Sequence, residues 1–167
     1  MHFNISTSSI FQCTLERAFK APMLCDVSKV HTGYGLMPKI THSSHDENWG
    51  QIGSSKKVYA AKSLTQSGGF VSEDHVLDRC ENNYWIIQVD NFQSWMLGFY
   101  AFKGTWKVKE LEYNKVAIDY SYDLYFKGYW FYPLNWAFAH IFWKKYMEKV
   151  QLNVKTLAES NEPFLYA

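Results

Sequence analysis

The sequence has no long hydrophobic run and no cluster of basic residues. Its most apolar stretch, residues 129–143, contains Pro133 and His140 and is shorter than the about 20 residues that a membrane-spanning helix needs. There are 17 Lys and Arg against 16 Asp and Glu, with no more than two basic residues in a row. The chain therefore lacks the positive charge that is typical of nucleic-acid-binding proteins. We expect no transmembrane segment and no nucleic-acid partner.

Cysteine is also scarce. Cys13, Cys25 and Cys80 are widely spaced and form no C-x-x-C pair. This spacing argues against a disulfide framework or a zinc ribbon, so we expect buried free thiols. The first residues lack the basic and apolar regions of a secretory signal, so we expect a cytoplasmic protein. The sequence indicates no cofactor.

Aromatic residues, in contrast, are abundant: 7 Trp, 12 Tyr and 12 Phe slightly outnumber Ile, Leu and Val together. Most of them lie between Tyr84 and Tyr146. The 47% of apolar and 20% of charged residues are typical of a globular protein and exclude disorder. At this length we expect one domain, residues 1–160, followed by a short tail, residues 161–167.

Period-two alternation of apolar and polar residues predicts an antiparallel sheet. The first strand covers residues 2–11, two short helices follow it, and a short strand near 36–41 lies in a loop region. Five further strands are expected near residues 51–60, 69–79, 83–91, 97–111 and 115–127.

The C-terminal part, Tyr132 to about Glu159, predicts one long helix with Pro133 in its first turn. Its expected inner face contains Trp136, Ala139, Trp143, Tyr146, Met147, Val150, Val154 and Leu157. A second apolar group on the opposite side contains Leu134, Phe138, Ile141 and Phe142. Such a patch needs a partner surface. Homodimerisation is the first hypothesis, and coverage by the loops around residues 33–48 or contact with lipid are the alternatives.

This order of elements predicts an α+β helix-grip fold, in which a curved antiparallel sheet of six or seven strands wraps around a long C-terminal helix. Fatty-acid-binding barrels have no long terminal helix, and lipocalins have no early helix pair. Nuclear-transport-factor-like folds begin with helices and end in strands, so none of the three fits this order of elements. The chain resembles the START-like (SRPBCC) superfamily, which includes polyketide cyclase/dehydrase-like and birch-pollen-allergen-like proteins. The resemblance rests on Trp49–Val58 and Gly68–Leu77, which are similar to the family's glycine, basic pair and strand followed by a turn glycine and a Val-x-Glu strand.

The resemblance implies a hydrophobic cavity between sheet and helix, but no particular catalysis. The candidate ligand-binding residues are inward-facing aromatic residues of the sheet and two helix residues: Tyr100, Phe102, Trp106, Tyr120, Tyr122, Trp143 and Met147. The same stripe also fits a filled core.

Two polar clusters are candidates for chemistry. Glu73 and His75 share one face of a strand and would form an acid/base pair if that face points inward, whereas Ser72 and Asp74 lie on the other face. The pattern does not decide which face is inside. The segment 42–47 (HSSHDE) holds two imidazoles and two carboxylates, but its spacing matches no structural zinc pattern and a solvated loop is the better interpretation, so we expect no metal.

Three functions remain open. The first is binding of a small hydrophobic, aromatic or lipid-like ligand without catalysis. The second is a polyketide cyclase/aromatase-type reaction that moves protons through an inward-facing acid/base pair such as Glu73 and His75, or through a tyrosine. The third is a dimerisation module with a filled core. The facing of strand 69–79 separates the second from the first.

Overall fold

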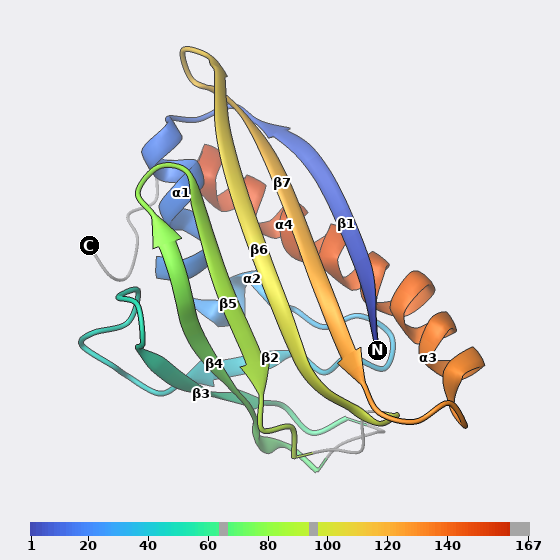
Figure 1. The fold of residues 1–167 in the computed structure, drawn as a ribbon. Coiled ribbons are helices and arrows are strands. Elements are labelled where there is room, and N and C mark those ends of the chain that lie inside the picture. Colours follow the sequence, from blue (N-terminus) through green and yellow to red (C-terminus); the bar gives the residue numbers. More distant parts are fainter. Residues whose placement is uncertain (64–66, 94–96, 161–167) are drawn as a thin grey trace.

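A curved antiparallel sheet wraps around a long C-terminal helix in the computed structural model, which describes residues 1–63, 67–93 and 97–160 (Figure 1). The strands follow the order β1-β7-β6-β5-β4-β3-β2. They are β1 (His2–Phe11), β2 (Ile40–Ser43), β3 (Ser55–Ala60), β4 (Gly69–Cys80), β5 (Tyr84–Asp90), β6 (Phe99–Glu112) and β7 (Lys115–Phe126). The predicted helix-grip fold is confirmed. The predicted tail, residues 161–167, lies outside the described residues, and the single-domain boundary stays a prediction.

Two short helices, α1 (Leu15–Leu24) and α2 (Val27–Val30), connect β1 to β2. The Thr14 hydroxyl caps α1 by accepting a hydrogen bond from the Arg17 amide at 3.3 Å, and Asp26 caps α2 in the same way through Ser28. The predicted short strand near 36–41 forms slightly later, as β2.

The C-terminal helix is continuous but contains a π-helical turn. Its parts are α3 (Tyr132–Ala137), η1 (Phe138–Trp143) and α4 (Lys144–Glu159). A π-helical turn contains more residues than an α-helical turn, so the residues before it are rotated about the helix axis. For this reason Asn135 is fully buried and Trp136 is exposed, whereas uniform α-helical spacing predicts Trp136 on the inner face. From Ala139 onwards the inner face is as predicted, although Leu157 is only half-buried.

Strand β7 has the regular alternation that the sequence predicts. Its inward residues are all buried: Val116, Ile118, Tyr120, Tyr122, Leu124 and Phe126. Strand β6 does not keep its alternation throughout, because its pairing with β7 shifts register between Phe99 and Ala101. Such a bulge turns one residue away from the regular pattern. Tyr100 is therefore exposed, beside Tyr125 and Lys127, and its predicted inward orientation is wrong.

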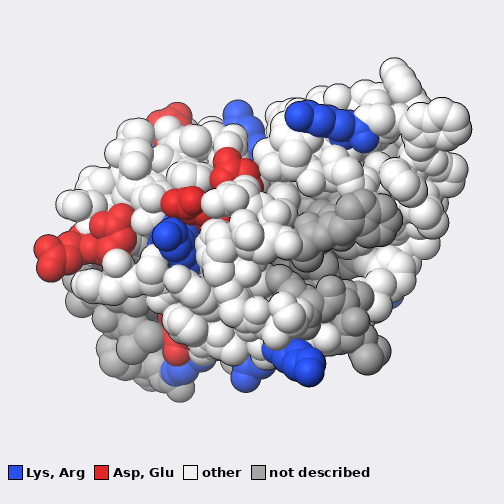
Figure 2. Space-filling model, turned by 90° about the horizontal axis from the view of Figure 1, so that it is seen from below, with Lys and Arg blue, Asp and Glu red and all other residues white. Residues whose placement is uncertain are grey.

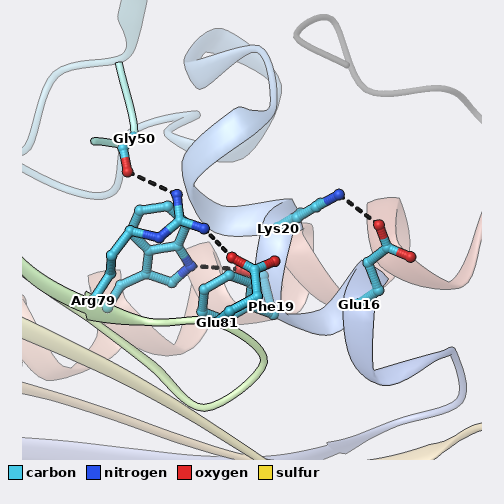
Figure 3. Close-up of polar contacts among 7 residues, drawn as sticks. Glu16, Phe19, Lys20, Gly50, Arg79 and Glu81 are labelled. Carbon is cyan, nitrogen blue, oxygen red and sulfur yellow. Dashed lines mark hydrogen bonds and ion pairs between the residues drawn. The ribbon is translucent and has the colours of Figure 1, made fainter. Parts of the chain in front are cut away.

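Helix α1 is fixed to the sheet through Trp85 of β5. The Trp85 indole N–H donates to the Phe19 carbonyl oxygen at 2.8 Å, and the two rings stack with centroids 4.9 Å apart. Arg79 of β4 covers Trp85 from the outside, donates to the Gly50 carbonyl at 2.8 Å and pairs with Glu81 (Figure 3). These contacts close one end of the space between helix and sheet.

Candidate functional site

A cavity of about 490 Å³ lies between the concave face of the sheet and the helices. Its wall comes from β3 to β7, from α1, α2 and the segment 36–38, and from the C-terminal helix. Ligand sites for small molecules have volumes of about 300 to 1,000 Å³ and are mainly apolar. The cavity fits this description, because most of the side chains around it are hydrophobic.

Five of the predicted ligand-binding residues line this cavity: Phe102, Trp106, Tyr120, Tyr122 and Trp143. The Trp143 ring lies 4.7 Å from Phe102 and 5.3 Å from Tyr122, centroid to centroid, so helix and sheet share one aromatic wall. Met147 is fully buried and belongs to the core instead. Tyr100 lies on the outer face, as described above. The ligand-binding role of the five residues stays a prediction.

The orientation of β4 decides which of Glu73 and Asp74 faces the cavity. Ser72 and Asp74 line the cavity. Glu73 and His75 point to the outside, where the His75 Nε2 atom lies 3.1 Å from a carboxylate oxygen of Asp90. The hypothesis of an inward-facing pair of Glu73 and His75 is therefore wrong, and the inward carboxylate is that of Asp74.

A buried lysine faces Asp74. Lys56 of β3 is directly opposite Asp74 of β4 in the strand pairing, and both residues line the cavity. The Lys56 ammonium nitrogen lies 3.9 Å from the centroid of the Trp49 ring, a cation–π distance. Burial lowers the pKa of Lys56, and the charge of Asp74 opposes this shift. Burial raises the pKa of Asp74 to about 6, and the charge of Lys56 partly offsets this.

His31 and three tyrosines complete the polar part of the cavity wall. The His31 Nδ1 atom and the Tyr146 hydroxyl form a hydrogen bond of 2.8 Å. Burial lowers the pKa of His31 to about 4, with a smaller effect from the Lys56 charge, so its imidazole is neutral at neutral pH. Burial also raises the pKa of Tyr120, Tyr122 and Tyr146, and the Asp74 charge adds to each shift. The charges of Lys56 and Asp74 therefore act on the other polar groups of the cavity wall.

Sequence reasoning missed Lys56 and His31 as parts of the site. Lys56 belongs to the basic pair of the motif, but only its alternation with the exposed Lys57 signals that one of the two points inward. His31 follows the second short helix in a region predicted as loop, and no pattern in the sequence marks it as buried.

The candidate metal segment 42–47 does not gather its side chains around one point. His42 stacks on Tyr59 with centroids 4.5 Å apart, and the Asp46 carboxylate accepts a hydrogen bond from the Asn48 amide. Among the described residues, no group of three or more His, Cys, Asp or Glu is arranged to bind a metal. Of the cysteines, Cys13 and Cys25 are buried as expected, whereas Cys80 is exposed.

The predicted interface patch is only partly on the surface. Leu134 and Ile141 are exposed, whereas Phe138 packs against Phe99 and lines the cavity, and Phe142 lies beside Gly35. Other apolar or aromatic side chains near the start of the helix extend the exposed area: Tyr129, Trp130, Phe131, Tyr132 and Trp136. In the view from below, the surface at the right, where Figure 1 places α3, carries few charged side chains (Figure 2). No helix within the described ranges is long and apolar enough to span a membrane.

Comparison with known proteins shows the fold through structure rather than sequence. No protein-family model and no curated protein matches the chain. The crystal structure of Ara h 8.0201 matches with a TM-score of 0.70 and 16% identity over 96% of this chain and 100% of that one. A norcoclaurine synthase from Thalictrum flavum, a point mutant with a transition-state analogue, matches with a TM-score of 0.64 and 10% identity over 95% and 94%.

A third solved structure is a two-domain protein. It is the di-domain ARO/CYC protein StfQ from the steffimycin biosynthetic pathway, with a TM-score of 0.66 and 8% identity over 95% of this chain and 52% of that one. Structural matches at such low sequence identity show the architecture of the chain but leave its activity open. All three neighbours have the fold that the sequence motif indicated. The chain has the same helix-grip fold as these three structures.

Proposed function

We propose that the protein binds a small hydrophobic molecule, aromatic or lipid-like, in the cavity between its sheet and its C-terminal helix. The observation that carries this proposal is the cavity of about 490 Å³ with its mostly apolar wall. Burial of a ligand's apolar surface contributes about 25 cal/mol per Å² before the costs of association. Tyr120 and Tyr122 add polar groups that would fix the orientation of the ligand. The expected cytoplasmic location remains part of this proposal.

The two other functions have less support. A cyclase-type reaction through Glu73 and His75 lacks its acid/base pair, because both residues face outward. A filled core is at odds with the size of the cavity. Binding of a small hydrophobic ligand is therefore the function that the geometry supports best.

The test is binding of the neutral fluorescent probe N-phenylnaphthylamine, together with native mass spectrometry of protein purified from its own host. Ile87→Trp, at a cavity-lining residue, should fill the space and reduce probe affinity at least about tenfold. Leu77→Trp, on the exposed face of the neighbouring strand, is the matched control and should bind as the wild type does. A folded wild-type protein that neither binds the probe nor retains a molecule would overturn the proposal.

We also propose that the exposed apolar area around Leu134 and Ile141 binds a second copy of the chain. The support is the high exposure of neighbouring side chains, 94% for Trp130 and 55% for Leu134, because clustered apolar surface usually marks an interface. Size-exclusion chromatography with light scattering should give a dimer for the wild type and for Leu152→Asp, which changes an exposed residue of α4. Ile141→Asp should give a monomer. A monomeric wild type would rule the dimer out.

A further inference from the structure

The Lys56 ammonium group has hydrogen-bond donors that no described protein atom accepts. Only 6% of Lys56 is exposed, and its nitrogen lies against the face of Trp49. Across the described chain, no carboxylate oxygen lies within 4.0 Å of this nitrogen and no acceptor forms a hydrogen bond with it. An ammonium group has three donors, and because Lys56 lines the cavity, a molecule inside the cavity can supply the acceptor. The cavity therefore favours a ligand that places a hydrogen-bond acceptor next to the Lys56 nitrogen.

The charge of Lys56 is nevertheless balanced inside the cavity. Of the described residues that line the cavity, only Lys56 and Asp74 belong to the Lys, Arg, Asp and Glu class. The pair has zero net charge whether the proton is on the amine or on the carboxyl group. His31 is neutral, and the high pKa values of Tyr120, Tyr122 and Tyr146 keep these residues neutral as well. The polar end of the cavity is therefore electrically neutral.

The histidine and the three tyrosines of the cavity wall already interact with one another. Tyr146 is hydrogen-bonded to His31, and Tyr120 and Tyr122 interact with each other. Lys56 is left as a donor without an acceptor, and Asp74 lies opposite it as the counter-charge. A ligand carbonyl oxygen provides two lone pairs and carries no charge, so it is a suitable acceptor for the Lys56 ammonium group.

A ligand carboxylate would make the same end negative. In a cavity of low polarity, an anion without a matching cation is much more costly than a neutral polar group. The charge of Asp74 already cancels that of Lys56, so no cation remains for the carboxylate. Without Asp74, Lys56 would be free to pair with it.

We propose that the Lys56–Asp74 end of the cavity selects an electrically neutral, hydrophobic ligand with a carbonyl oxygen, and that Asp74 is the residue that rejects the corresponding carboxylate. Lys56 donates a hydrogen bond to the carbonyl oxygen, and the aromatic wall contacts the hydrophobic part. This inference rests on the proposed binding function and adds the class of ligand to it.

The experiment compares three probes with the same ring system, namely methyl naphthyl ketone, naphthoate and ethylnaphthalene, by isothermal titration calorimetry at neutral pH. The wild type should bind the ketone at least about tenfold more tightly than either of the other probes. Asp74→Asn should reverse the order of ketone and naphthoate. Lys56→Met should reduce ketone affinity to that of ethylnaphthalene. Lys57→Met and Glu73→Gln, which change the adjacent residues on the outer face of the same two strands, should behave as the wild type.

Each outcome has one meaning. If no probe binds to the folded wild type, the proposed function itself fails. If ethylnaphthalene binds but the ketone binds no better, or if naphthoate binds as tightly as the ketone, only the present inference fails. An unchanged order of affinities in Asp74→Asn would also overturn it. Ethylnaphthalene binding verifies that each variant keeps its cavity, and Asp74→Ser replaces Asp74→Asn if the latter does not fold.

Discussion

Lys56 and Asp74 stand opposite each other on neighbouring strands and bring the two charges of the cavity wall together. The adjacent residues of the same strands, Lys57 after Lys56 and Glu73 before Asp74, form a corresponding pair on the outer face. One strand pairing therefore holds one such pair in the cavity wall and another pair of the same kinds of residue on the outer face. The difference between them is solvation.

The first prediction uses this contrast. Lys56→Met alone should lower the free energy of unfolding by about 1 kcal/mol or more, because the Asp74 carboxylate then loses the nearby positive charge that partly offsets its desolvation. The double variant Lys56→Met/Asp74→Leu should be at least as stable as the wild type. Urea denaturation measures both. The exposed counterpart Lys57→Met/Glu73→Leu should change stability by less than about 1 kcal/mol, and an equal cost for Lys56→Met and Lys57→Met would contradict the prediction.

A close contact between Gly104 and Tyr122 gives the second prediction. A Cβ atom added at Gly104 would lie 2.7 Å from two atoms of the Tyr122 ring, so Gly104→Ala must displace this part of the cavity wall. We expect a loss of about 1 to 3 kcal/mol in the free energy of unfolding. In a Tyr122→Ala background the same change should cost almost nothing. A double-mutant cycle in urea tests this coupling, and equal costs in the two backgrounds would argue against it.

The third prediction concerns His31 and acid. Its pKa falls from 6.5 in the unfolded chain to about 4 in the fold. Between these values the unfolded chain binds a proton that the folded chain does not, so the contribution of His31 to stability is lost as the pH falls through this window. Asp74, with a pKa raised from 3.8 to about 6, acts in the opposite direction.

His31→Gln separates the two effects. Between pH 7 and pH 4 this variant should lose less stability than the wild type, by on the order of 2 kcal/mol. Urea denaturation at several pH values gives the comparison. His45→Gln removes an exposed imidazole and should follow the wild type. Parallel pH profiles for His31→Gln and the wild type would show that His31 is not buried in its neutral form.

The fourth prediction compares two basic residues that both appear in Figure 3. Arg79 stacks on Trp85, with 4.3 Å between its guanidinium carbon and the ring centroid, and hydrogen-bonds to Gly50. Lys20 pairs with Glu16 along the exposed side of α1. Arg79→Ala should cost about 1 to 3 kcal/mol, and Lys20→Ala no more than about 0.5 kcal/mol. Thermal denaturation ranks the two, and equal losses would contradict this account of how α1 is held.

Several features of the fold follow from local chemistry and could be read from the sequence. The alternation of β7 is visible because Tyr and other apolar residues occupy every second position from Val116 to Phe126, and the side chains of a strand alternate between two faces. The long helix and the short connections were visible for the same kind of reason. The aromatic wall of the cavity was therefore largely predictable, as were Tyr120 and Tyr122 within it.

Other features depend on contacts between distant parts of the chain. A bulge in the pairing of β6 with β7 places Tyr100 outside, and a π-helical turn exchanges Trp136 for Asn135 in the interior. The strand pairing of β3 with β4 selects Asp74 over Glu73 and sets it beside Lys56. Periodicity gives two faces for each strand, but only packing decides which face is buried.

The sequence by itself determined the class of fold and the aromatic character of its interior, because both arise from residue type and local spacing. The tertiary structure alone decided the polar chemistry of the cavity. His31, Lys56, Asp74 and Tyr146 are far apart in the chain, and they come together only when the sheet curves around the helix. Their altered pKa values are consequences of that shared burial.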